Sequence, residues 1–387
     1  MDLHPASVHG RHRRKQARRR IFFISLAALA LLAVGSVAVV VWPGGDASSD
    51  GRGQPAASGG KSTTTHDGHT HVSPASSPPP AASSANPGVG PAVATGSAPH
   101  YMAVAPDGRF AYIADPVAGA VIRFDTTSNS ATVTIPIPQA PPQMVTFAPD
   151  GSRAYVSAYT ADFTANYVVT VDTATDTAVG AIGVGRGPYA AGTTPDGHLL
   201  YVQYYDDAHV DVIDTASGAL VNQIPAAPCP HWVVFTHDGR FAYTTNHFSD
   251  VVTVLELGSN TVLTTIPVGD GPHSLEMSPD GSRIAVVNYV GGDVSIIDTA
   301  SNTVVGNVPA VGAGPQDVTY APDGRHFYTA NVNDGTVSVV DAASDVVTAR
   351  IPTGTSPTSV AVTPDGLRAF VTNFDDGTVR VLDTAGG

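Results

Sequence analysis

Seven Asp-Gly dipeptides recur along this chain at nearly constant spacing, and no other feature constrains its fold as strongly. The intervals between them are 43, 46, 42, 42, 43 and 42 residues. Between them lie short runs of alternating β-branched and aromatic residues, separated by Pro, Gly and Asn, which is the pattern of antiparallel strands joined by tight turns. A period in the low forties is typical of four-stranded propeller blades. The dipeptides begin at Asp107, Asp150, Asp196, Asp238, Asp280, Asp323 and Asp365.

Each repeat predicts four strands, and one such sheet alone cannot bury both of its apolar faces, whereas seven in a ring bury them against each other. The chain ends after the third strand of the last repeat, and residues 91–99 resemble the segment that precedes the last Asp-Gly. We therefore expect residues 91–99 to supply the outer strand of the last blade and to cover its edge. The predicted fold class is all-β: a seven-bladed β-propeller of four-stranded antiparallel blades over 88–387. The second strands are expected at 110–114, 154–158, 200–204, 242–246, 284–288, 327–331 and 369–373.

The N-terminal region predicts a membrane anchor. Residues 1–20 carry seven basic side chains against one acid, and residues 21–42 contain no charge for 22 residues. At about 1.5 Å per residue, such a helix spans the hydrocarbon core of a bilayer, and its basic flank stays in the cytoplasm. We expect a single-pass cell-membrane protein with a cytoplasmic N-terminus and an extracytoplasmic propeller. Two alternatives are a cleaved signal peptide, with a weak cleavage site at Ala47-Ser48-Ser49, and a twin-arginine export signal at Arg19-Arg20.

Residues 43–87 are rich in Gly, Ser, Pro and Ala and predict a disordered linker between the anchor and the propeller. Three histidines within this linker could bind Cu(II), Ni(II) or Zn(II) weakly, or could simply be polar residues of a tether. They are His66, His69 and His71.

Charge and cysteine content exclude two other possibilities. The chain has a net charge of −14 although its basic tail contributes +6, so about −20 falls on the residues beyond 20. Such an acidic exterior repels phosphate backbones, which argues against nucleic acid as a partner. Cys229 is the single cysteine, so no disulfide forms within the chain.

Three of the second strands carry a recognisable motif: Tyr243-Thr244-Thr245-Asn246, Tyr328-Thr329-Ala330-Asn331 and Phe370-Val371-Thr372-Asn373. Over residues 88–387 the chain resembles the YVTN-type propeller repeat family, which includes surface-layer and YncE-like extracytoplasmic proteins. The resemblance implies seven blades and an exported location, but no single chemistry. The first three blades depart from the motif, with Ile113-Ala114-Asp115, Ser157-Ala158 and Gln203-Tyr204 in its place.

Candidate functional residues gather at one end of the predicted ring. The residue after the Pro that opens each innermost strand should line the channel mouth: His100, Gln143, Tyr189, His231, His273, Gln316 and Thr358. Loops after the second strands add Asp115, Tyr159, Tyr205, Asn246, His247, Asn288, Tyr289, Asn331, Asn373 and Phe374 to the same face. Together with Trp232, these side chains predict a site for a small polar molecule, a glycan or a peptide.

The histidines allow more than one interpretation. His231, His247 and His273 could hold a divalent transition metal, with Cys229 as a thiolate ligand, or each imidazole could bond the backbone of a neighbouring blade. No other cofactor is predicted, and the sequence has no nucleophile elbow, zinc-protease, P-loop or dinucleotide motif. The only channel carboxylates expected are Asp115, Glu276 and Asp317.

The leading interpretation is a monomeric binding module that meets an envelope protein, a glycan or a small molecule. The alternative is a hydrolase or lyase of the lactonase type that uses these histidines.

Overall fold

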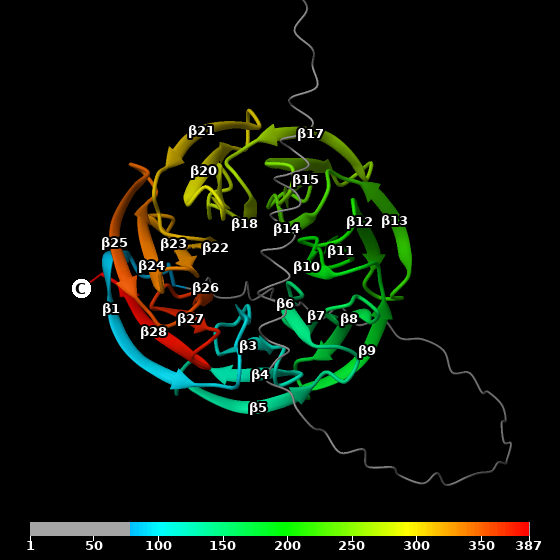
Figure 1. Ribbon diagram of the computed structural model, residues 1–387, viewed down its shortest axis with the longest axis horizontal. Coiled ribbons are helices and arrows are strands. Elements are labelled where there is room, and N and C mark those ends of the chain that lie inside the picture. The colour runs from blue at the N-terminus through cyan, green and yellow to red at the C-terminus, as the bar shows by residue number, and fades with distance from the viewer. Residues whose placement is uncertain (1–77, 387) are drawn as a thin grey trace, which may run out of the picture.

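The computed structural model describes residues 78–386, and these form seven four-stranded antiparallel sheets arranged as blades in a ring (Figure 1). The innermost strands are β2 (Tyr101–Val104), β6 (Pro142–Phe147), β10 (Pro188–Thr193), β14 (Pro230–Phe235), β18 (Pro272–Met277), β22 (Pro315–Tyr320) and β26 (Pro357–Val362). The second strands are β3 (Phe110–Asp115), β7 (Arg153–Tyr159), β11 (Leu199–Tyr204), β15 (Phe241–Asn246), β19 (Arg283–Asn288), β23 (His326–Asn331) and β27 (Arg368–Asn373).

The third strands are β4 (Ala120–Asp125), β8 (Asn166–Asp172), β12 (His209–Asp214), β16 (Val251–Glu256), β20 (Asp293–Asp298), β24 (Thr336–Asp341) and β28 (Thr378–Ala385). The outer strands are β5 (Ser130–Pro136), β9 (Thr177–Gly183), β13 (Leu220–Pro225), β17 (Thr261–Pro267), β21 (Thr303–Val308), β25 (Val346–Pro352) and β1 (Ser83–Ala94). Blade 1 is β2–β5, and blades 2–6 follow in chain order. The predicted seven-bladed propeller is confirmed.

Blade 7 closes the ring with strands from both ends of the described chain. Its order is β1-β28-β27-β26, and Val93 pairs with Val379. In Figure 1, β1 lies on the rim beside β28. This confirms the expected outer strand, although β1 begins at Ser83 and so includes residues that the sequence analysis placed in the linker.

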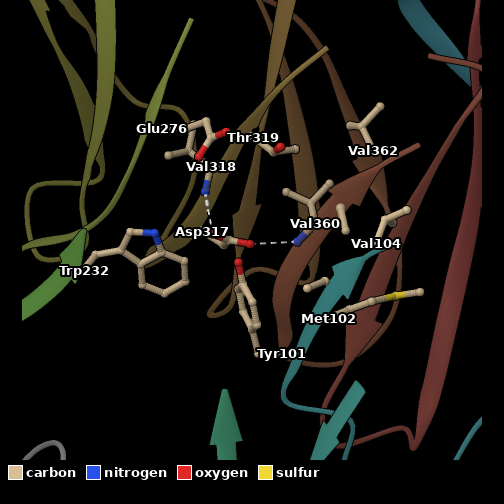
Figure 2. A pocket seen from close by; sticks show the side chains of 12 residues that line it. Tyr101, Met102, Val104, Trp232, Glu276, Asp317, Val318, Thr319, Val360 and Val362 are labelled. Atoms are coloured by element: carbon tan, nitrogen blue, oxygen red, sulfur yellow. Dashed lines mark hydrogen bonds between the residues drawn. The ribbon is translucent and has the colours of Figure 1, made fainter. Parts of the chain in front are cut away.

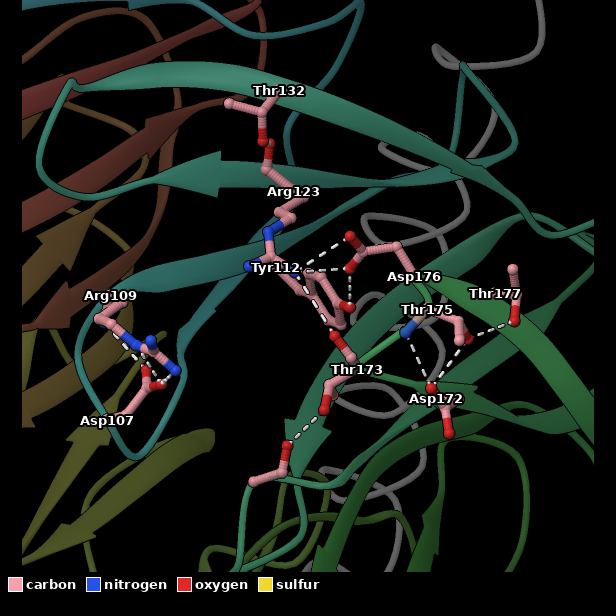
Figure 3. Close-up of polar contacts among 11 residues, drawn as sticks. Asp107, Arg109, Tyr112, Arg123, Thr132, Asp172, Thr173, Thr175, Asp176 and Thr177 are labelled. Carbon is pink, nitrogen blue, oxygen red and sulfur yellow. Dashed lines mark hydrogen bonds and ion pairs between the residues drawn. The ribbon is translucent and has the colours of Figure 1, made fainter.

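The Asp-Gly dipeptides form the turns between first and second strands, as predicted. All seven glycines have left-handed backbones, with φ between 66° and 73°, which a side chain disfavours. The preceding aspartate caps the turn: Asp107 Oδ1 accepts a hydrogen bond from the Arg109 amide at 3.0 Å (Figure 3). Aspartates that end third strands cap the next turn in the same way, as Asp172 Oδ1 does for the Thr175 amide at 2.9 Å. Both sets of aspartates are therefore structural.

The hydrophobic core lies between adjacent blades. One cluster joins Phe110 and Tyr112 of blade 1 to Val145 and Val156 of blade 2. Polar contacts from β3 and β4 add to it: the Tyr112 hydroxyl donates to Asp176 Oδ1 at 2.5 Å, and Arg123 Nη1 lies 2.8 Å from the same oxygen (Figure 3). Asp176 belongs to the turn of blade 2, so these bonds fasten one blade to the next.

Within residues 78–386, no helix is long and apolar enough to cross a membrane. The apolar segment 21–42 and the linker histidines His66, His69 and His71 lie outside the described residues.

Candidate functional site: the propeller channel

The residues that follow the strand-opening prolines converge at the mouth of the channel in blades 3–5. The ring centroids of His231 and His273 lie 4.3 Å apart, and that of Tyr189 lies 3.9 Å from His231. The pairing register shifts directly after Pro230 and after Pro272, which is the signature of a β-bulge. A bulge changes the direction in which side chains point, so two consecutive residues of one inner strand can both face the channel.

Two loop residues complete this mouth cluster, which we define as Tyr189, His231, His247, His273 and Tyr289. The His247 ring lies 5.4 Å from His231, and the Tyr289 ring lies 5.8 Å from His273. These five side chains are between 0% and 7% exposed. The cluster predicted from sequence therefore assembles, but its rings cover one another and leave little surface for a large partner.

Two imidazoles of the mouth cluster, those of His231 and His273, are uncharged near neutral pH. Burial is the main cause that holds the pKa values of His231 and His273 well below the usual range, and mutual repulsion among the histidines lowers them further. Within the described residues, His231 Nε2 and His273 Nδ1 have no hydrogen-bond partner. Cys229 lies beside them, with its Sγ 3.8 Å from His231 Nδ1.

Several mouth residues bond the backbone of a neighbouring blade, which was the alternative interpretation for the histidines. His100 Nδ1 lies 2.8 Å from the Gln143 carbonyl oxygen, and His247 Nδ1 lies 3.1 Å from the Pro272 carbonyl oxygen. The Thr358 hydroxyl donates to the His100 carbonyl at 2.5 Å. These contacts link successive blades around the mouth.

The asparagines that end the second strands are turned into their blades. Each is completely buried, and each side-chain amide donates to groups of its own blade or its connecting segment. Asn288 Nδ2, for example, donates to Asp293 Oδ1 at 2.8 Å and to Ser295 Oγ at 3.0 Å. Their side chains are therefore not exposed at the channel mouth, and their role in ligand binding stays a prediction. They are Asn246, Asn288, Asn331 and Asn373.

Among residues 78–386, no group of three or more His, Cys, Asp or Glu side chains is arranged to hold a metal ion. The proposed trio His231, His247 and His273 therefore packs as tilted and edge-on rings and forms no metal-binding group.

Farther along the inner strands, the channel contains a cavity of about 170 Å³. Tyr101, Trp232, Glu276 and Asp317 line it, and Figure 2 shows these four side chains around one space, with valines on its other side. The Tyr101 and Trp232 rings meet edge to face, with centroids 5.2 Å apart. Glu276 follows its strand-opening proline by four residues and Asp317 by two, so both lie deeper than the mouth cluster. The sequence predicts these carboxylates as channel residues, but it does not predict the cavity.

Comparison with known proteins gives a partial family match and a structural likeness. Residues 194–319, from blade 3 to blade 6, match the Cytochrome D1 heme domain family. No curated protein sequence matches the chain. Among solved structures, Kuenenia stuttgartiensis hydrazine synthase is similar, with a TM-score of 0.67 and 23% identity over 75% of this chain and 96% of that chain. At this identity the likeness shows the fold alone.

Proposed function

We propose that this protein is an extracytoplasmic binding module that holds a small polar ligand inside its propeller channel. The observation that carries the proposal is the cavity lined by Tyr101, Trp232, Glu276 and Asp317, because it combines aromatic rings with two carboxyl groups around one space. Its walls come from five blades, so only the closed ring assembles it.

The location is part of the same proposal. The basic segment 1–20, followed by the uncharged segment 21–42, supports a membrane anchor with the propeller outside the cytoplasm. The YVTN-type resemblance of the second strands supports export as well. A tether at residues 43–77 would let the propeller reach a ligand some distance from the membrane.

Haem is the group that the name of the matched family suggests, and the residues present do not fit it. The channel cavity of about 170 Å³ is smaller than the roughly 300–1,000 Å³ of ordinary small-molecule pockets. A second hollow of about 440 Å³ lies among loops of blades 6 and 7, but its lining offers no His, Cys, Met or Tyr side chain as an axial ligand. We therefore derive no haem chemistry for this chain.

A cavity-filling substitution tests the proposed function. Ala103 lines the cavity, so Ala103→Leu should fill part of it, whereas Ala131→Leu on the exposed outer strand β5 is a matched control. Small neutral and charged probes, namely glycerol, tert-butanol, acetate and tetramethylammonium, are titrated into the full chain in detergent and followed by ligand-observed NMR. Saturable binding of at least one probe that Ala103→Leu abolishes and Ala131→Leu retains supports the function. Binding of no probe, or binding that Ala103→Leu leaves unchanged, contradicts it.

The hydrolase alternative is tested on the same preparations. Its catalytic residues would be His231, His247 and His273, and neutral imidazoles can act as general bases. Sustained hydrolysis of γ-butyrolactone that His231→Gln removes would replace the binding function with an enzymatic one.

A further inference from the structure

The channel cavity holds two carboxyl groups and no cationic side chain to pair with them. Glu276 on β18 and Asp317 on β22 come from adjacent blades, and no Arg, Lys or His is among the residues that line the cavity. Asp317 is 3% exposed. Glu276 is surrounded by protein but keeps partial exposure, which is consistent with exposure to the cavity that it lines.

The two carboxylates differ in how firmly they are held. Asp317 Oδ2 accepts a hydrogen bond from the Val360 amide, and Oδ1 accepts one from the Val318 amide, both at 3.0 Å. Figure 2 shows both bonds. Within residues 78–386, no hydrogen bond to the Glu276 carboxylate shifts the pKa of that group. One carboxylate is thus fixed by the backbone, and the other is available to a ligand.

The electrostatics agree with this geometry. Burial raises the pKa of Glu276 to about 8, and repulsion from Asp317 adds to the rise. Burial also raises the pKa of Asp317 to about 7, although backbone hydrogen bonds oppose it. The other titratable groups that act on this pair are the hydroxyls of Tyr101, Tyr189 and Tyr320, and none of them is cationic. A positive charge in the cavity would favour the ionised form of both carboxylates.

We infer that the cavity binds a small organic ammonium ion, held by the carboxylates of Glu276 and Asp317 and by the ring faces of Tyr101 and Trp232. Aromatic faces attract alkylammonium ions, and the Val360 and Val362 side chains supply apolar surface for their methyl groups. An inorganic cation is less well suited, because no set of three metal-ligating side chains exists among the described residues. This inference rests on the proposed function and names the ligand class of the same cavity.

Isothermal titration calorimetry tests the inference with the full chain in detergent at constant ionic strength. Tetramethylammonium and methylammonium chloride are the probes, tert-butanol is the uncharged probe of similar shape, and potassium chloride is the inorganic control. The substitution Glu276→Gln keeps the size of the side chain and removes its charge. Glu256→Gln at the exposed end of β16 removes the chain's other glutamate and serves as the matched control.

We expect saturable binding of an ammonium probe that Glu276→Gln weakens at least tenfold and Glu256→Gln leaves unchanged. Because ionised carboxylates are required, affinity should rise at least tenfold from pH 6 to pH 9. Trp232→Leu should weaken binding as well, through loss of the ring face. Equal affinity for tert-butanol, equal affinity for potassium, or an unchanged affinity in Glu276→Gln would overturn the inference. Binding of tert-butanol alone would leave the proposed function standing, whereas binding of no probe would refute both.

Discussion

At the residue scale, the recurring asparagines show why a repeated polar side chain need not be a ligand contact. Asn288 is buried beneath the segment that leads into β18, and a Cβ added to Gly269 would lie 2.3 Å from Asn288 Nδ2. The same approach recurs between Gly312 and Asn331 and between Gly354 and Asn373. Glycine is needed at these positions because the asparagine side chain occupies the space of a Cβ.

Gly269→Ala should therefore lower the free energy of unfolding by about 1–3 kcal/mol, the usual cost of overpacking a well-packed site. The matched control is Gly180→Ala in β9, where an added Cβ meets nothing within 4 Å. Chemical denaturation of both variants measures the difference. If the two substitutions had equal effects, the close approach at Asn288 would not matter to stability.

At the scale of the elements, tyrosines of the second strands in blades 1, 3 and 4 bond the outer turn of the next blade. Tyr201 donates to Asn260 at 2.5 Å, and Tyr243 donates to Asn302 at 2.6 Å, in the manner of the Tyr112–Asp176 bond. Tyr328 on β23 faces blade 7, whose outer strand β1 arrives from the other end of the chain and therefore supplies no such turn. Within the described residues its buried hydroxyl has no hydrogen-bond partner.

This difference predicts opposite outcomes for one chemical change. Tyr243→Phe should lower the free energy of unfolding by about 0.5–1.5 kcal/mol, because it removes a hydrogen bond between blades. Tyr328→Phe should leave stability unchanged or raise it, because it removes a buried hydroxyl that bonds nothing among residues 78–386. Thermal unfolding of both variants under the same conditions measures the difference. A similar loss of stability in both would contradict the role of the Tyr243 hydroxyl in holding two blades together.

At the scale of the whole molecule, the channel contains two sets of buried groups with opposite responses to pH. The imidazoles of His231 and His273 have folded-state pKa values below 6.5, so the stability they contribute is lost as the pH falls below that value. The carboxylates of Glu276 and Asp317 have raised pKa values, so their contribution is present at low pH and is lost as the pH rises through about 7 and 8.

The two effects oppose each other between about pH 4.5 and 6.5, where we expect the highest melting temperature. Of these two sets only the carboxyl groups still titrate above pH 6.5, so the melting temperature should fall until about pH 8 and then level off. Glu276→Gln should flatten this alkaline decline, and Glu256→Gln should retain it. Melting curves recorded from pH 4 to pH 9 provide the measurement, and a decline of the same steepness in Glu276→Gln would contradict the assignment.

The sequence predicts the ring more completely than the site. The Asp-Gly spacing is enough for the number of blades, and the likeness between residues 91–99 and a later repeat predicts the closing strand. The cavity is harder to predict from the sequence. Glu276 and Asp317 lie at different distances along the chain from the prolines that open their strands, and only the closed ring brings them near Tyr101 of blade 1. The orientation of the Asn288 side chain could not be predicted from the sequence either, because it depends on hydrogen bonds to side chains five and seven residues away.

The pairing of β1 with β28 also sets the order in which the chain can fold. Arg380 Nη1 donates to the Gly90 carbonyl across 290 residues of sequence, so this contact cannot form until β28 has been synthesised. Contacts at such separation form slowly, because the loop-closure entropy precedes any gain from pairing. Until then the edge of β28 is open to a strand from another chain. Crowded nascent chains are therefore expected to exchange their first strands, and the resulting domain-swapped chains of open rings are the characteristic misassembly of this architecture.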